Sequence, residues 1–482
     1  MTTTRRVTVL ILALLAAAQL SAGTGRIVII NEDRPGTGFN DPTPVQPVGG
    51  NNGTTLGQQR LNVFLAAAAK WESNLNTNVD IRVSASFAPI NDCTDTTGIL
   101  GYASPVDWRR DSEGAPQLNV WYPIALANKF ANRDLAPGVD DISVRFNASV
   151  DNSTCLATSN WYYGLDSNHG GDIDLFVVVL HELGHGLGIA GKADPPNFSL
   201  NTPTIADVHT FDTTTGLRWD QMTVEQRRVS MLNTGNLAWD GANVRSETSR
   251  FLIPMTTLSV SSPTPVARNY DVGLATFGPA AATSFLSGRI VLASDEANTN
   301  GPSTTDGCTA LTNASAIAGN IALIDRGSPL APIEPCTFVK KARNAQAAGA
   351  IGLLIVDNVR DTCAPPSMSG TAADVTIPVV SISKADGDVL KAQLSISVQA
   401  SLRADPSQLA GTTRQGYLRL YAPCTFEAGS SIRHWDSTAT PNLLMEPFIG
   451  SDLLHGLDIT MAQLLDLGWS QPPRSGRRVL KK

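Results

Sequence analysis

The chain has 482 residues, of which 42% are hydrophobic and 16% charged, and its formal net charge is −7. This length is too great for one ordinary core, so we expect at least two domains. The composition is that of a globular protein and excludes collagen-like or coiled-coil chains. Because the net charge is mildly negative, a nucleic-acid partner is not expected.

The first residues predict an export signal over residues 1–22. Arg5 and Arg6 give a positive start, an apolar run follows, and small residues lead to the exit. The run is shorter than the roughly 20 residues that span a bilayer, and no later segment is apolar enough. We therefore expect a secreted protein, extracellular or periplasmic, without stable membrane insertion.

Six cysteines in an exported chain predict disulfides, and none of them forms a CxxC pair. Two pairs are favoured because each stays within one proposed domain, and the third follows by subtraction. The predicted pairs are Cys93 with Cys155, Cys308 with Cys336, and Cys363 with Cys424.

The spacing of apolar residues predicts the regular elements in chain order. The predicted helices span residues 56–75, 174–189, 338–348, 384–394 and 460–467. The predicted strands span residues 26–31, 79–87, 141–147, 288–293, 319–325, 351–357, 377–382 and 417–421. Strands and helices alternate between about residues 257 and 407, which indicates a separate α/β module.

One predicted helix contains the segment His181-Glu182-Leu183-Gly184-His185. Histidines four residues apart lie on one face of a helix and can share one metal ion. A carboxylate beside the first ligand can take a proton from zinc-bound water, whose pKa zinc lowers to about 7. We therefore predict His181 and His185 as ligands of one catalytic zinc ion and Glu182 as the catalytic base. The alternative is a pair of core histidines without a metal.

The pattern continues through Gly186 and Gly188 and resembles the HExxHxxG motif of metzincin metallopeptidases. In most metzincins a third histidine ligand follows three residues after the last glycine. Here that position is Gly191, so the third ligand must lie elsewhere.

The stretches 430–436 and 441–447 resemble the distal third histidine and the Met-turn of leishmanolysin-like metzincins. By that resemblance His434 is the third zinc ligand, and Met445 lies beneath the metal as a hydrophobic floor. Residues 466–469 resemble the end of the same catalytic domain. The resemblance covers residues 26–256 and 411–469.

Other residues compete for the role of third ligand. The rivals are His209, Asp194, Asp207 and Asp212. The remaining two histidines, His169 and His455, are expected to face solvent.

Calcium is a further cofactor to consider, without support in the sequence. The aspartates that suggest it fit no EF-hand loop and are expected to be helix caps and solvated carboxylates. They are Asp134, Asp140, Asp141, Asp172 and Asp174.

Residues 319–327, 336–341, 344–350 and 377–380 together resemble a protease-associated (PA) domain, over most of residues 262–407. That resemblance implies an accessory domain without catalytic residues, of a kind that usually accompanies a peptidase. Its place between His185 and His434 is tolerable if the two ends of the insertion lie close together.

The expected fold is α+β: a metzincin-like catalytic domain, with a twisted sheet and an active-site helix, interrupted by an α/β PA domain. The expected divisions are a signal at 1–22, the catalytic domain at 23–257 and 408–470, the PA domain at 258–407, and a basic tail at 471–482.

The resemblance implies a secreted zinc-dependent endopeptidase that hydrolyses peptide bonds in protein or peptide substrates. One alternative is a zinc exopeptidase, an aminopeptidase, because PA domains accompany those enzymes too. Another is a catalytically inactive binding protein that uses the PA domain as its interaction surface.

Overall fold

The computed structural model describes residues 23–472, with short gaps. The predicted export signal, most of the basic tail and Asp194 lie outside the described residues. The gaps are 92, 95–96, 153, 158, 193–202, 280–285, 299–300, 302, 328–335, 360–362, 367, 369, 371 and 451–452.

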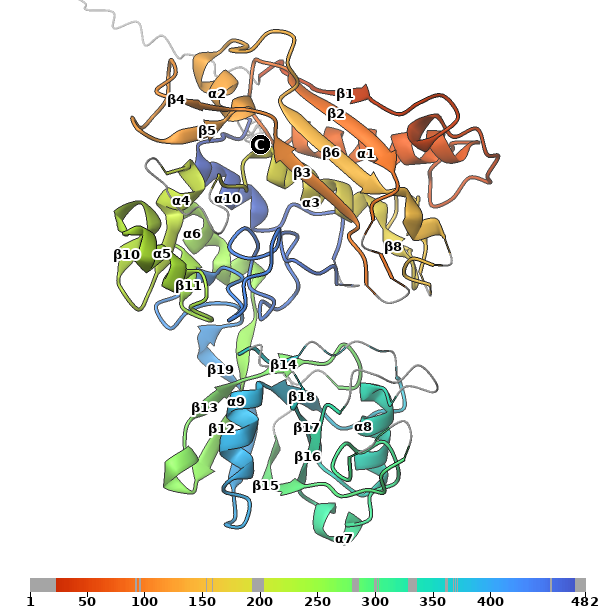
Figure 1. Cartoon of the computed structure of the whole chain (residues 1–482), viewed down its shortest axis with the longest axis vertical. Helices are drawn as coiled ribbons and strands as arrows, with labels where there is room; N and C mark the ends of the chain where they lie inside the picture. Colours follow the sequence, from red (N-terminus) through yellow and green to blue (C-terminus); the bar gives the residue numbers. More distant parts are fainter. Residues whose placement is uncertain are drawn as a thin grey trace, which may run out of the picture.

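The chain forms two lobes, one above the other in Figure 1. We call residues 23–253 together with 410–472 the split domain, and residues 254–409 the inserted domain. One large cluster of buried hydrophobic side chains fills the split domain, and two smaller clusters fill the inserted domain. Each lobe therefore has its own core, as the length of the chain predicts.

The central sheet of the split domain has the strand order β1-β2-β6-β3, with β3 antiparallel at one edge. Along β2 every second residue is buried, because only one face of the sheet meets the core. The strands are β1 (Ile27–Asn31), β2 (Ile81–Ala88), β3 (Gly101–Pro105) and β6 (Ile142–Asn147).

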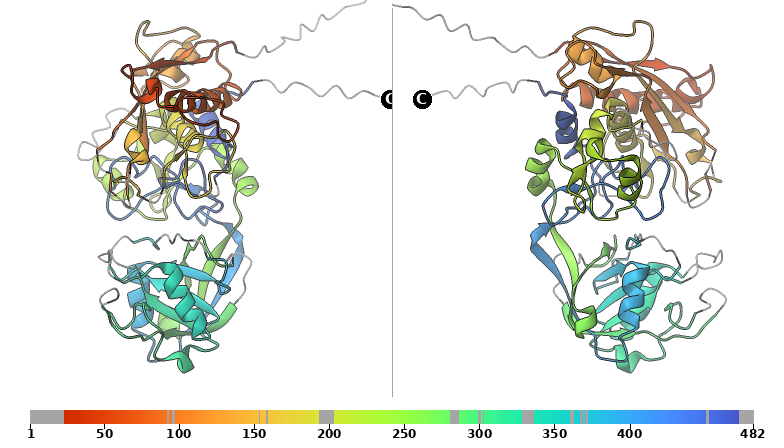
Figure 2. Two further views of the ribbon diagram at one scale, coloured as in Figure 1. Left: turned by 90° about the vertical axis from the view of Figure 1, so that its right-hand side faces the viewer. Right: turned by 60° about the vertical axis from the view of Figure 1, so that its left-hand side comes forward.

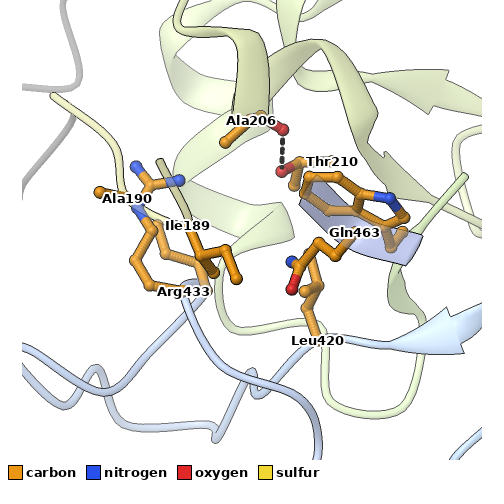
Figure 3. A pocket seen from close by; sticks show the side chains of 9 residues that line it. Ile189, Ala190, Ala206, Thr210, Leu420, Arg433 and Gln463 are labelled. Carbon is orange, nitrogen blue, oxygen red and sulfur yellow. Dashed lines mark hydrogen bonds between the residues drawn. The ribbon is translucent and has the colours of Figure 1, made fainter. Parts of the chain in front are cut away.

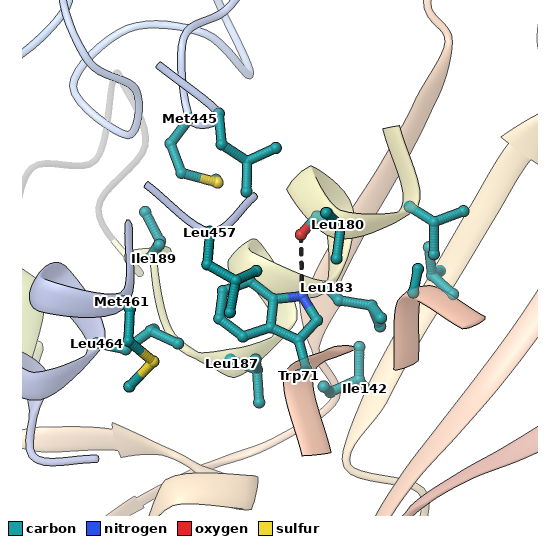
Figure 4. Close-up of a cluster of buried hydrophobic side chains, with 14 of the residues drawn as sticks. Trp71, Ile142, Leu180, Leu183, Leu187, Ile189, Met445, Leu457, Met461 and Leu464 are labelled. Carbon is teal, nitrogen blue, oxygen red and sulfur yellow. Dashed lines mark hydrogen bonds between the residues drawn. The ribbon is translucent and has the colours of Figure 1, made fainter. Parts of the chain in front are cut away.

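Two long helices, α1 (Leu56–Glu72) and α3 (Leu175–Leu187), pack against each other beside this sheet. The indole Nε1 of Trp71 on α1 donates a hydrogen bond to the carbonyl of Leu180 on α3, at 3.2 Å (Figure 4). Gly186 lets α3 approach the sheet, because a Cβ there would overlap the side chain of Ile142. The glycines of the histidine motif thus serve packing as well as the helix end.

The other elements of the split domain are short. Its remaining helices are α2 (Ile124–Ala131), α4 (Ile205–His209), α5 (Val224–Ser230), α6 (Ala242–Phe251), α10 (Thr460–Leu467) and the 3₁₀ turns η1 (Gly38–Asn40), η2 (Ala148–Asp151) and η3 (Trp219–Gln221). Its remaining strands are β4 (Trp108–Arg110), β5 (Trp121–Pro123), β7 (Trp161–Tyr162), β8 (Ile173–Asp174), β9 (Thr210–Asp212), β10 (Leu217–Arg218), β11 (Leu237–Trp239) and β20 (Leu418–Arg419).

The inserted domain is built on a sheet of order β13-β12-β19-β15-β16-β17-β18-β14, flanked by helices. Its strands are β12 (Pro254–Ser262), β13 (Asn269–Asp271), β14 (Gly273–Leu274), β15 (Leu286–Leu292), β16 (Ile321–Asp325), β17 (Gly352–Val356), β18 (Val379–Ile382) and β19 (Gln399–Leu409). Its helices are η4 (Thr264–Val266), α7 (Ala314–Ile317), α8 (Phe338–Ala347) and α9 (Lys384–Lys391). The chain is thus mixed α and β, and a sheet with helices accompanies the helix that carries His181 and His185, as expected.

The two ends of the inserted domain lie side by side. Strands β12 and β19 pair antiparallel from Pro254 opposite Leu409, and the amide of Ala410 donates to the carbonyl of Ile253 at 2.9 Å. The boundaries predicted at residues 258 and 407 fall inside this ladder. Figure 2 shows the two strands running together between the lobes. Beyond them, β20 pairs with β11, so the chain resumes the split domain where it left it.

All three predicted disulfides are confirmed. The Cys363–Cys424 bridge joins the inserted domain to the split domain. Arg419 of β20 adds an ion pair across the same boundary, with its Nη1 at 3.3 Å from the carboxylate of Asp271. No described helix has both the length and the apolarity needed to cross a bilayer.

The start of α3 depends on Asp174, one of the aspartates that the sequence predicts as helix caps or solvated carboxylates. Its Oδ1 accepts a hydrogen bond from the amide of Phe176 at 2.9 Å, while its Oδ2 lies 2.7 Å from His455 Nε2. The His455 ring stacks on Phe176 with 4.0 Å between centroids. The expectation that His455 faces solvent is wrong, because its side chain, 16% exposed, pairs with a buried carboxylate. His169 is half-buried, and its Nδ1 lies 2.7 Å from the carbonyl of Asp172.

Asp174→Ala should destabilise the protein by about 1–2 kcal/mol, because it removes a helix cap and the partner of His455. The measurement is urea unfolding. Asp174→Asn is the matched control, since asparagine keeps a side-chain oxygen that can cap the helix and should retain most of the stability. Equal stability of all three proteins would show that this cap has no energetic role.

Replacing residues 255–408 by two glycines, together with Cys424→Ser, should leave a folded split domain. Pro254 and Leu409 are paired neighbours, so a short bridge joins them without strain. A shorter connection also has a smaller entropic cost of loop closure. The serine removes a thiol that the deletion would leave unpaired. Circular dichroism and zinc content test this; a misfolded product would mean that the two lobes depend on each other for folding.

Candidate metal centre

Three histidine side chains converge at the centre of the split domain. The Nε2 atoms of His181 and His185 lie 3.0 Å apart, and each lies 3.2 Å and 3.1 Å, respectively, from Nε2 of His434. Two of these residues occupy successive turns of α3, and His434 arrives from the chain that follows the inserted domain. The structure thus brings together the three ligands that the sequence proposed from widely separated segments.

A backbone carbonyl fixes each imidazole ring. The Nδ1 atoms of His181, His185 and His434 lie 2.6–2.7 Å from the carbonyl oxygens of Leu444, Ile189 and Ser430, respectively. A carbonyl oxygen can only accept a hydrogen bond, so each Nδ1 carries the hydrogen and each Nε2 presents its lone pair. Carbonyls that orient metal-bound histidines in this way are typical of zinc sites.

This donor set fits a zinc ion. Three lone pairs within 3.2 Å repel one another unless a cation lies among them. Tetrahedral zinc with Zn–N bonds of 2.0–2.1 Å places its nitrogen ligands about 3.3 Å apart, close to the observed spacing. Calcium prefers oxygen ligands and does not suit three imidazoles.

Burial keeps the histidines neutral, which metal binding requires. It lowers the pKa of His181 to about 3 and that of His185 to about 4, and the pKa of His434 falls well below its usual value. In each case loss of hydration disfavours the charged ring. The rings are therefore ready to bind a cation at neutral pH.

Glu182 follows His181 on α3 and lies under the edge strand β3. Its side chain is buried, and burial raises its pKa to about 8, although a hydrogen bond from the Ala103 amide opposes this shift. A Cβ on Gly101 would lie 3.4 Å from the Cγ of Glu182. Glu182 is not among the described side chains whose ligand atoms converge with the triad. It occupies a position suited to proton transfer.

Met445 packs directly beneath the motif helix. It is fully buried, and a Cβ on Gly184 would lie 2.9 Å from its sulfur. Figure 4 shows Met445 with Leu180, Leu183 and Leu187 of α3 in one apolar cluster. The carbonyl of the preceding Leu444 holds His181, so this turn supports the metal centre with both its backbone and its side chain.

Gly191 stands at the position of the third histidine in most metzincins, and here it contacts Arg433, the residue before His434. A Cβ on Gly191 would overlap the guanidinium of Arg433, whose Nη1 lies 3.3 Å from the carboxylate of Asp207. Figure 3 shows Arg433 beside Ile189 and Ala190, at the edge of a small pocket. No pattern in the sequence marks Arg433, although it immediately precedes His434.

The described rivals for the third ligand have other partners. His209 Nε2 lies 3.0 Å from the carbonyl of Asp466, and its ring stacks on Trp239. Asp207 pairs with Arg433 and caps α4, and Asp212 accepts hydrogen bonds from the turn at Thr214 and Thr215. None of these side chains belongs to the converging group within the described part of the chain.

The suggested calcium ligands likewise have structural roles. Asp134 and Asp172 accept backbone hydrogen bonds, Asp140 pairs with Arg82, and Asp141 bonds Asn128. Asp174 is the cap of α3 already described. A second convergence among the described residues, Asp306 with Cys308 and Cys336, contains the disulfide and so has no thiolate to offer a metal.

Comparison with known proteins identifies one part of the chain. The family model for the PA domain matches residues 286–390. Residues 286–390 are a PA domain. The match lies within the inserted domain, covers its parallel strands β15 to β18 and helices α7 and α8, and ends inside α9.

Curated relatives match stretches that are short compared with the chain. Aminopeptidase YwaD of Bacillus subtilis is 43% identical over 77 residues, which is 16% of this chain and 15% of that protein. ER degradation-enhancing alpha-mannosidase-like protein 3 of Xenopus laevis is 38% identical over 91 residues, 17% of this chain and 9% of its own length. Vacuolar-sorting receptor 1 of Pisum sativum is 29% identical over 155 residues, 31% and 23% of the two chains. The chain thus spans less than a quarter of each of these relatives.

Among solved structures, BSAP, a zinc aminopeptidase from Bacillus subtilis, is 21% identical. The match covers 42% of this chain and 41% of that chain, with a TM-score of 0.22. Such a low score describes no common overall fold, so it carries no conclusion about the split domain.

His434→Ala should weaken zinc binding by at least about 100-fold, because it removes one of three converging nitrogens. His209→Ala is the matched control and should leave about one zinc per chain, since His209 bonds Asp466 away from the triad. Elemental analysis after dialysis against a weak chelator distinguishes the two. Loss of zinc from the His209 variant alone would move the third ligand to the Asp207–Asp212 segment.

Proposed function

We propose that this chain is a zinc-dependent peptidase whose active site is formed by His181, His185, His434 and Glu182. The observation that carries the proposal is the convergence of three neutral imidazoles beside one buried carboxylate. Zinc bound there would acidify water and polarise a carbonyl group. The PA domain adds support, because such domains usually accompany peptidases.

Glu182 is the acid–base group in this proposal. Its carboxylate accepts a proton from the attacking water and later donates that proton to the nitrogen of the leaving amine. Burial beneath β3 excludes bulk water from the carboxylate and holds it near the triad. A cation at the triad would favour the ionised form of Glu182 and so prepare it to act first as a base.

We further propose that the split domain is metzincin-like. The support is the position of Met445 beneath Gly184, the delayed third histidine, and the contact between Gly191 and the segment that carries it. Protein or peptide substrates follow from this assignment. Three disulfides support a secreted protein in an oxidising compartment.

Two peptidase modes remain candidates for this site. The sequence resemblance implies an endopeptidase, whereas the match to aminopeptidase YwaD favours the exopeptidase alternative. The matched stretch of aminopeptidase YwaD, 77 residues, is shorter than the PA domain of this chain. The choice between endopeptidase and exopeptidase is therefore tested with substrates. The inactive binding protein is the third alternative, and the presence of Glu182 beside the triad favours catalysis over it.

Paired fluorogenic peptides test the mode of cleavage. An endopeptidase cleaves an internally quenched peptide whether its amino terminus is free or acetylated, whereas an aminopeptidase requires the free amine. Casein hydrolysis with and without a zinc chelator establishes the metal dependence in the same assay. Metal-independent cleavage, or none on any substrate by the zinc-loaded protein, would overturn the proposal.

Glu182→Ala should abolish turnover while zinc stays bound, because this carboxylate moves protons and does not hold the metal. The expected loss in kcat is at least about 10²–10⁴-fold, the usual contribution of general acid–base catalysis. Glu225→Ala, at an exposed position on α5, is the control and should behave like the wild type. Near wild-type proteolysis by the Glu182 variant would remove its assigned role.

A further inference from the structure

Arg433 connects three segments that surround the candidate metal centre. It immediately precedes His434, and its guanidinium packs against the backbone of Gly191, where any Cβ would overlap it. Gly191 lies two residues after Ile189, whose carbonyl accepts the Nδ1 hydrogen of His185 at 2.7 Å. Arg433 thus contacts the loop that orients the second histidine while belonging to the segment that carries the third.

Asp207 holds the other side of the guanidinium. Its Oδ1 lies 3.3 Å from Arg433 Nη1, and its side chain is fully buried. Its Oδ2 accepts hydrogen bonds from the hydroxyl and the amide of Thr204, at 2.6 and 2.8 Å, and so is fixed at the start of α4. The Arg433 side chain is 13% exposed, so a rigid, largely buried pair joins α4, the loop after α3, and the distal segment.

We propose that Arg433, held by Asp207 and seated on Gly191, is a positioning residue that sets His434 in register with His185 for zinc binding. This inference rests on the proposed function and deepens it. Gly191 is required because the guanidinium occupies the space that a side chain would fill. The segment that carries His434 is therefore held near the metal centre by the contact of Arg433 with Gly191, the position at which most metzincins have their third histidine.

Electrostatics alone predicts the opposite effect on metal binding. A guanidinium repels a nearby cation, so the charge of Arg433 opposes zinc binding. If charge were the main influence, removing Arg433 would strengthen zinc binding. If positioning dominates, its removal weakens zinc binding even when the charge balance is kept.

The test is zinc affinity in the charge-balanced variant Arg433→Met/Asp207→Asn, measured by competition with a chromophoric chelator. Asparagine keeps an oxygen that can accept from Thr204, so the start of α4 is preserved. We expect affinity about 10–100-fold below that of the wild type, the usual effect of losing a group that orients metal ligands. Cobalt-substituted protein should show an altered visible spectrum, which a purely structural change elsewhere would not cause.

Arg60→Met/Asp151→Asn is the matched control. Arg60 is also largely buried, with 5% of its side chain exposed, and its Nη2 lies 3.2 Å from Asp151 in the same domain. That pair contacts none of the three histidines. Its loss should lower stability towards urea but leave zinc affinity within about twofold of the wild type, since this pair orients none of the three histidines.

Gly191→Ala provides a second, independent variant that keeps both charges. The added methyl group must displace the guanidinium, so zinc affinity should fall in the same direction. Wild-type protein that binds no zinc would overturn the proposed function and this inference together. Wild-type protein that binds zinc tightly, with folded Gly191→Ala or double-variant protein binding it equally well, would overturn this inference alone.

Discussion

The mutual approach of three imidazole nitrogens is the constraint on which the arrangement of the split domain depends. Lone pairs 3.0–3.2 Å apart are unfavourable without a cation, so the fold must hold each ring in place. It does so through three backbone carbonyls and through burial that keeps the rings neutral. Close packing under Gly184 and Gly186 then seats the helix on Met445 and Ile142. Glycine, methionine and isoleucine residues that take no part in the chemistry thus determine whether the three histidines can converge.

The inserted domain separates two parts of one centre in sequence without separating them in space. Its entry and exit strands are hydrogen-bonded partners, so the 249 positions of sequence between His185 and His434 add little to the path that the chain must close on folding. The pairing of β20 with β11 restores continuity immediately afterwards.

The sequence predicted features that depend on local periodicity and on strong chemical types. The helix carrying His181 and His185, its cap at Asp174, the alternating strand β2 and the three cysteine pairs were all accessible in this way. The proximity of His434 to the motif was accessible only through resemblance, because no local pattern connects residues so far apart.

Other features left no signal in the sequence. The carbonyls of Leu444, Ile189 and Ser430 belong to groups that every residue has, so side-chain identity cannot reveal them. His455 was placed in solvent because its partner Asp174 lies 281 positions away. In the sequence Arg433 is indistinguishable from a surface arginine, and only the fold places Gly191 and Asp207 beside it. Tertiary contact decides the role of each of these residues.

The Cys363–Cys424 bridge has a consequence for any cut in the polypeptide backbone. It closes a covalent ring over 61 positions of sequence that includes β18, α9, β19 and β20. A single cut of the backbone anywhere within that ring leaves both fragments attached to each other. The segment that carries His434 lies just outside the ring, so such a nick would preserve the connection between the PA domain and the part of the chain that completes the histidine triad. A nicked protein would therefore run as two fragments on a reducing gel and as one covalently joined molecule on a non-reducing gel.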